Sequence, residues 1–140
     1  MRRQGGSVTI ELAILAPSLM LVASLAVFVG RVSFAWAAVD SAAYSAARVA
    51  SLARDPDTAR TRARDSAIET LAGQGLTCQT LDVTVDTSQF AYAIGEPAAV
   101  TVAIACQVSL ADAALPGIPP THWVSAQYSS PLDLYRSRTG

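Results

Sequence analysis

The chain has 140 residues, enough for one modest domain in addition to an apolar segment. Its ten basic residues, all of them arginine, nearly balance eleven acidic residues. This balance gives no support to nucleic-acid binding, which a strongly basic surface would favour. The hydrophobic fraction of 51% is raised by alanine and by one N-terminal stretch.

That apolar stretch begins directly after the carboxylate of Glu11. Residues 12–30 contain no ionisable side chain, and the next charge is Arg31. As a helix rising about 1.5 Å per residue, the stretch would be roughly 28 Å long, close to the hydrocarbon thickness of a bilayer. Arg2 and Arg3 precede it, so the positive-inside rule places the N-terminus in the cytoplasm and the rest of the chain outside.

Helical spacing continues beyond the apolar stretch. Pro17 lies inside the stretch, where its missing amide N–H predicts a kink or a looser turn. After Gly30, apolar residues recur at spacings of three and four, which predicts one helical face: Val32, Trp36, Val39, Ala43, Ala46, Ala50 and Ala53. Because most of this face is alanine, another helix can approach closely, although the core so formed is thin.

A second helix is predicted after a short break. Asp55 is suited to cap it, Pro56 to occupy its first position and Gly73 to end it. Its apolar stripe consists of Ala59, Ala63, Ala67 and Leu71.

The remainder of the chain has the alternation typical of strands. Residues 81–86 and 100–110 each place apolar side chains on one parity, which predicts two half-buried antiparallel strands joined by a long turn. Residues 122–130 could supply a third strand through Val124, Ala126 and Tyr128. The fold class expected is therefore α+β: a long N-terminal transmembrane helix, a second helix, and a small antiparallel sheet that the helices cover.

Two cysteines, Cys78 and Cys106, follow the predicted span. If this part is extracytoplasmic, a disulfide between them is the natural interpretation, and two independent buried thiols are the alternative. Cys78 has the opposite parity to Leu81 and Val83, so the disulfide would connect the loop before the first strand to the second strand.

The residues indicate little chemistry. The single histidine, His122, lies beside Trp123 and is expected to be structural. Two distant cysteines are too few for a zinc site, and no C-x-x-C, G-x-S-x-G or phosphate-binding loop occurs. We therefore expect no enzyme activity, no catalytic residue, no metal, no cofactor and no small-molecule substrate.

Three interpretations of the N-terminus remain open. A secretory signal could be cleaved at the small-x-small sequence of residues 35–37, but the apolar run is long for such a signal. A plain signal anchor would leave Glu11 and the glycines incidental. A third interpretation, in which Glu11 and the two glycines have a joint role, follows from a resemblance to a known family.

The sequence "GGSVTIELAILAP" resembles the start of class III prepilins of tight-adherence (Tad/Flp) pili, specifically the TadE-like pseudopilins. The E-x-A-x-x-x-P pattern of this family is matched by Glu11, Ala13 and Pro17, and residues 42–51 and 123–137 also resemble family segments. The resemblance implies that a prepilin peptidase cuts after Gly6, which makes Ser7 the first mature residue and Glu11 the fifth. Cleavage would expose a charged amine on Ser7, and Glu11 of a neighbouring subunit would pair with it, so that neither charge is buried alone in an apolar assembly. Leu12 stands where major pilins have tyrosine, which favours a minor pilin.

The expected organisation is therefore a prepilin leader (1–6), a transmembrane and assembly helix (7–30), a helical extension with the second helix (31–72), and an extracytoplasmic β region (73–140). The resemblance implies as partners the membrane, a prepilin peptidase, other pilin subunits and the pilus assembly machinery. The main alternative is a single-pass anchored extracytoplasmic binding domain with no filament role. An envelope enzyme is the weaker alternative.

Overall fold

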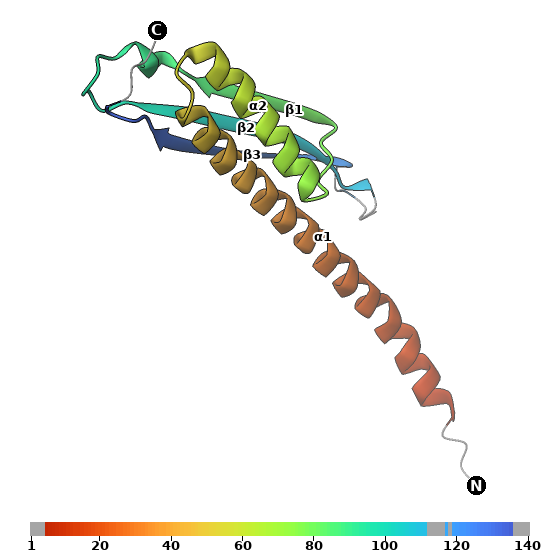
Figure 1. Ribbon diagram of the computed structural model, residues 1–140. Helices are drawn as coiled ribbons and strands as arrows, with labels where there is room; N and C mark the ends of the chain where they lie inside the picture. Colours follow the sequence, from red (N-terminus) through yellow and green to blue (C-terminus); the bar gives the residue numbers. More distant parts are fainter. Residues whose placement is uncertain (1–4, 112–116, 118, 136–140) are drawn as a thin grey trace.

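The computed structural model describes residues 5–111, 117 and 119–135 (Figure 1), with side chains described from Leu12 onward. In chain order its elements are helices α1 (Gly5–Ser51) and α2 (Pro56–Gly73), strand β1 (Thr80–Asp86), the 3₁₀ turn η1 (Ser88–Ala91), and strands β2 (Ala99–Ser109) and β3 (Thr121–Pro131). The predicted α+β class, with a long N-terminal helix, a second helix and a small antiparallel sheet, is confirmed.

Helix α1 has two parts with different surroundings. Its 47 residues give a length of about 70 Å, and its N-terminal part projects away from the rest of the molecule (Figure 1). Among the described residues, the first buried side chain is Ala35, and the helix then contributes to the core as far as its C-terminal end. The head, which we define as residues 31–135, therefore includes the C-terminal part of α1.

Alanine dominates the faces on which the helices pack. Helix α1 packs against α2, β2 and β3. It buries a continuous row of small side chains that includes Ala38, Ala42 and Ala46, and α2 buries the predicted Ala59, Ala63, Ala67 and Leu71. Ser45 Oγ and Ser66 Oγ form a hydrogen bond of 3.0 Å between the two helices. Small side chains thus allow close packing of α1 on its neighbours.

The prediction for the α1 face is wrong at one residue. Trp36 was expected on the buried face, but 44% of its surface is exposed. The buried face includes Ala35 and Ala38 on either side of it, because a side chain as large as tryptophan does not fit where the helix lies close to the sheet. Of the other residues of the predicted face, Val32 is partly buried and five are buried: Val39, Ala43, Ala46, Ala50 and Ala53.

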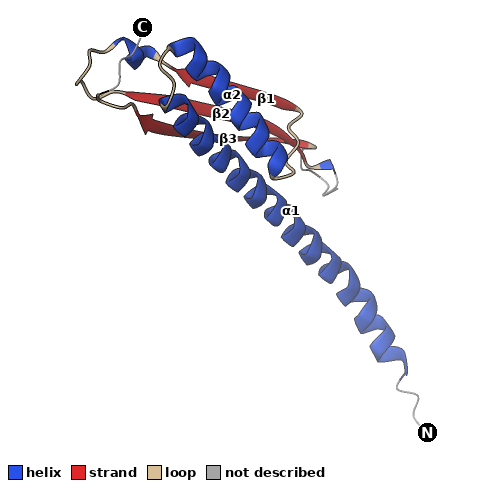
Figure 2. Ribbon diagram, viewed as in Figure 1, coloured by secondary structure: helices blue, strands red, loops and turns tan. Residues whose placement is uncertain are grey.

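The three strands form an antiparallel sheet in the order β1-β2-β3. Val83 pairs with Ile104, and Ile104 with Ala126, so the apolar parities of all three strands share one face. Both helices cover this face (Figure 2), and the opposite face has no covering element in the described part of the chain. The half-buried strands predicted from alternation are confirmed.

The connections show why the elements begin where they do. The Asp55 carboxylate accepts a hydrogen bond of 2.8 Å from the backbone N–H of Thr58, which is an N-cap for α2. Gly75, at a φ of 73°, turns the chain after α2. The connection between β1 and β2 is more ordered than a loose turn, because η1 buries Phe90 in the core while Tyr92 stays exposed.

Candidate functional site

The residues of the predicted processing and assembly site lie at the start of α1. Gly6, Ser7 and Glu11 fall within its first two turns, since the helix begins at Gly5. Ser7 and Glu11 are four residues apart, which places them about one turn apart on the same side of the helix. The backbone is described here, whereas the side chains of these residues and residues 1–4 of the predicted leader lie outside the described structure.

The apolar stretch that follows is uncovered. Most of its large side chains are at least half exposed in the isolated chain: Leu12, Ile14, Leu15, Leu19, Met20, Leu21, Val22, Leu25, Val27 and Val29. Phe28 is partly buried. By length and composition, α1 is the one helix in the described part that could cross a membrane. An apolar surface of this extent requires lipid or other protein around it, so this helix is a candidate single-pass anchor.

Pro17 does not interrupt the helix. Its missing N–H leaves the carbonyl four residues earlier without its usual donor, yet α1 continues as one uninterrupted helix in Figure 1. In the next position, the Ser18 hydroxyl donates a hydrogen bond of 2.8 Å to the carbonyl oxygen of Leu15. This bond adds a donor to the turn that contains Pro17, but it does not reach the carbonyl of Ala13, which is the one that loses its donor.

The alternative of a cleaved secretory signal conflicts with the packing of α1. A cut after Ala37 would divide a continuous helix and would remove Ala35, which is only 2% exposed. The residues on both sides of this point belong to the same core. The fold therefore favours an N-terminal segment that stays attached to the head.

The predicted disulfide is present. Cys78 and Cys106 are bonded, with a Cα–Cα distance of 5.4 Å. Cys78 precedes β1 and Cys106 lies in β2, so the bond connects the α2–β1 loop to the central strand, as expected from their parity. A disulfide is typical of an oxidising compartment, which agrees with a head outside the cytoplasm.

Comparison with known families bears on the first part of the chain. The family model described as TadE-like protein matches residues 6–48. This TadE-like segment contains Glu11, the whole uncovered stretch and most of α1, and the resemblance predicted from the N-terminal motif is confirmed over it. The match ends before α2, so the resemblance predicted for residues 123–137 lies outside it and stays a prediction. No curated protein and no solved structure matches the chain.

The match supports a pilin-like role associated with Tad pili, and the long apolar helix suggests a single-pass membrane anchor. Within the described residues, no group of three or more His, Cys, Asp and Glu side chains is placed to hold a metal ion. His122 is exposed on β3 beside the exposed Trp123. No hydrogen bond or ion pair joins its side chain to another residue in the described part of the chain.

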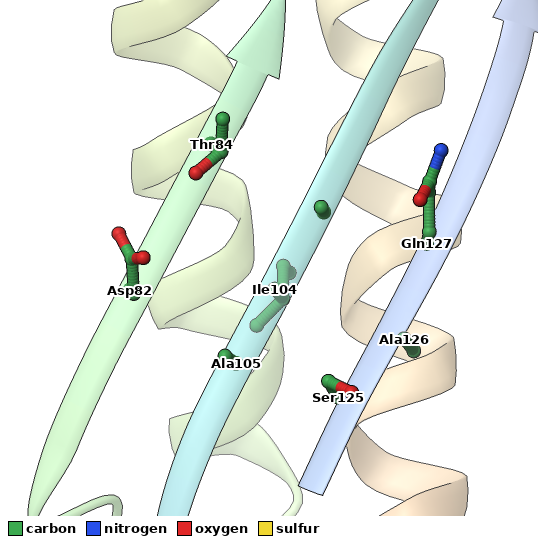
Figure 3. A pocket seen from close by; sticks show the side chains of 8 residues that line it. Asp82, Thr84, Ile104, Ala105, Ser125, Ala126 and Gln127 are labelled. Carbon is green, nitrogen blue, oxygen red and sulfur yellow. The ribbon is translucent and has the colours of Figure 1, made fainter.

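A second feature was missed by the sequence analysis. The uncovered face of the sheet has a shallow hollow of about 330 Å³ that includes Asp82, Thr84, Ser125 and Gln127 in its lining (Figure 3). The alternation of β1 and β3 does indicate that these side chains point away from the core. Only the pairing register shows that they meet across β2, and this register cannot be read from either strand alone.

Proposed function

We propose that the chain is a minor pilin or pseudopilin of a Tad-type pilus, cleaved by a prepilin peptidase after Gly6. The observation that carries this proposal is the coincidence of the TadE-like segment with the uncovered apolar part of α1. In the membrane, lipid would cover this surface. In an assembled pilus, the same surface would pack against other subunits.

Glu11 is assigned a pairing role in assembly. Cleavage would create an α-amino group on Ser7 that is charged near neutral pH. The carboxylate of Glu11 in one subunit would accept the Ser7 amine of its neighbour, because an unpaired ion in an apolar interface costs several kcal/mol. The pairing would therefore set how far one subunit is shifted along the next.

The proposed topology has the N-terminus in the cytoplasm and the head outside. Arg2 and Arg3 before the span favour this orientation, and the Cys78–Cys106 disulfide agrees with it. The partners proposed are the prepilin peptidase, the assembly machinery and other pilin subunits. An enzymatic role is not proposed, because the role of the matched family is structural.

Cleavage is tested by intact mass and N-terminal sequencing of the chain extracted from membranes with and without the peptidase. We expect a mature chain that starts at Ser7 only when the peptidase is present. Gly6→Val should block the cut, and Gly5→Val is the matched control that should still be cut. A chain that keeps Met1 under all conditions would support the alternative of a plain anchored domain.

Assembly is tested with Glu11→Ala. This variant should insert into the membrane and be cleaved, but it should be missing from sheared pili when these are probed by immunoblot. Asp40→Ala is the matched control, because it removes an exposed carboxylate from the same helix outside the span. Equal incorporation of the Glu11 variant and the control would contradict the pairing role.

A further inference from the structure

The uncovered face of the sheet carries a set of polar side chains that have no hydrogen-bond partner among the described residues. They come from the two edge strands and stand on either side of two alanines of β2. We call this feature the sheet trough and define it by Asp82, Thr84, Ala103, Ala105, Ser125 and Gln127. Figure 3 shows the polar side chains on the near side of the sheet and both helices behind it.

The register builds the sheet trough in two rows. Asp82 pairs with Ala105, which pairs with Ser125 on the other side. Thr84, Ala103 and Gln127 form the next row in the same way. Because neighbouring strands are about 4.8 Å apart, the polar walls on β1 and β3 are roughly 10 Å apart, with a floor of two methyl groups between them.

Polar residues beyond each end of the sheet trough are bonded to one another. At one end, Thr80 Oγ1 donates to Gln107 Oε1 at 3.1 Å, and Gln107 Nε2 donates to Thr121 Oγ1 at 3.3 Å. At the other end, the hydroxyls of Thr101 and Ser129 are 2.6 Å apart.

The four wall side chains differ from these end residues. No hydrogen bond or ion pair joins any of the four to another described residue. One carboxylate, two hydroxyls and one amide thus offer both donors and acceptors around an apolar floor.

An aromatic side chain extends the sheet trough on the same face. Trp123 lies two residues before Ser125 on β3, in the row of Gln107, and half of its surface is exposed. A large exposed ring beside a polar hollow offers a flat apolar platform that adds contact area at little entropic cost.

The charge of this face restricts what it can bind. Asp82 and Asp86 are its ionised groups, and none of the three strands contains an arginine. Phosphate, sulfate and carboxylate polymers would therefore be repelled. A pyranose ring has the complementary chemistry, since it presents an apolar C–H face and hydroxyls around its rim that both donate and accept.

We propose that the sheet trough binds an uncharged glycan. One pyranose ring lies on Ala103 and Ala105, with its rim hydroxyls bonded to the polar walls, and the next ring of the chain stacks on Trp123. The proposal goes beyond the pilin function and is independent of it, since a head that is anchored but never assembled would have the same face.

Binding is tested on the full chain in a detergent without a sugar headgroup. The chain has two tryptophans, so a Trp36→Phe background leaves Trp123 as the only reporter of tryptophan fluorescence. The probes are cellotriose and triacetylchitotriose, both uncharged, with trigalacturonate as the anionic control. We expect a saturable fluorescence change in the millimolar range with at least one uncharged probe and none with the anionic one. Absence of saturation with both uncharged probes would overturn the proposal.

Two variants connect the response to the sheet trough. Ala105→Leu fills the floor of the sheet trough and should weaken binding about tenfold. Gln127→Ala removes one exposed wall group and should weaken binding to a similar extent. Because Gln127 is exposed, this second variant should fold even if Ala105→Leu does not. Thr61→Leu on α2, away from the sheet, is the control and should bind normally. Equal weakening by the control would overturn the proposal. The proposal would also be overturned if the parent chain self-associates and shows no response to sugar, and Ala105→Leu abolishes the self-association. The face would then be a protein interface.

Discussion

The charge of Asp55 contributes to the fold through the N-cap of α2. Hydrogen bonds from Thr58 hold the pKa of its carboxyl below the ordinary value of 3.8. A lowered pKa means that the ionised form stabilises the folded state above that value, and that this contribution is lost as the pH falls through the folded-state pKa.

We expect Asp55→Asn, which keeps a capping oxygen, to melt near the wild-type temperature at pH 7. Between about pH 5 and pH 2 it should lose less stability than the wild type, because the asparagine does not titrate. Asp55→Ala should melt lower than both at pH 7. Circular dichroism melts across this range test the expectation, and parallel pH profiles for the wild type and Asp55→Asn would contradict it.

Residue-level prediction succeeded where a role depends on local sequence. The cap at Asp55 could be predicted because it needs only a carboxylate and the next turn of backbone. Trp36 could not be placed, because its exposure depends on how closely α1 approaches the sheet. The pairing assigned to Glu11 is between subunits, so the fold of one chain does not test it.

At the level of elements, the alanine packing of α1 leads to a second prediction. Ala46 is fully buried, so Ala46→Leu inserts a larger side chain into a space that cannot expand without separating packed elements. We expect it to lower the free energy of unfolding by about 1–3 kcal/mol.

Ser41→Leu is the matched control, because Ser41 is exposed on the same helix. It should leave stability nearly unchanged. Chemical denaturation of both variants followed by circular dichroism measures the difference, and equal stability would show that the packing of α1 adapts more easily than expected.

The elements themselves could largely be predicted, for physical reasons. The strands bury one face only, so the alternation of apolar and polar residues predicts them directly. Helix α2 has a capping residue at its start, Asp55, and a glycine at its end, Gly73. The turn η1 was missed because the burial of Phe90 depends on the core above it. The sheet trough was missed for a similar reason, since it exists only when three strands pair in one register.

At the level of the whole molecule, the disulfide should supply much of the stability of a small head. The two bonded cysteines are 28 residues apart in the sequence. For a loop of this length, the chain-entropy model gives a contribution of about 3.5 kcal/mol to the free energy of unfolding. The double variant Cys78→Ser/Cys106→Ser should be destabilised by this amount in chemical denaturation. Reductant should destabilise the wild type similarly and leave the double variant unchanged, and an insensitive wild type would contradict the prediction.

The boundary between anchor and head leads to the last prediction. In the described structure the core starts at Ala35, so a chain that begins at Arg31 keeps all of it and loses only the uncovered stretch. We expect this chain to be soluble without detergent and to unfold cooperatively. Its melting temperature should equal that of the head in the full-length chain. A chain that begins at Ser41 loses Ala35, Ala38 and the fully buried Val39, and should be less stable by several kcal/mol. Calorimetry of the two chains separates these outcomes. Equal melting temperatures would mean that residues 31–40 of α1 belong to the anchor and not to the head.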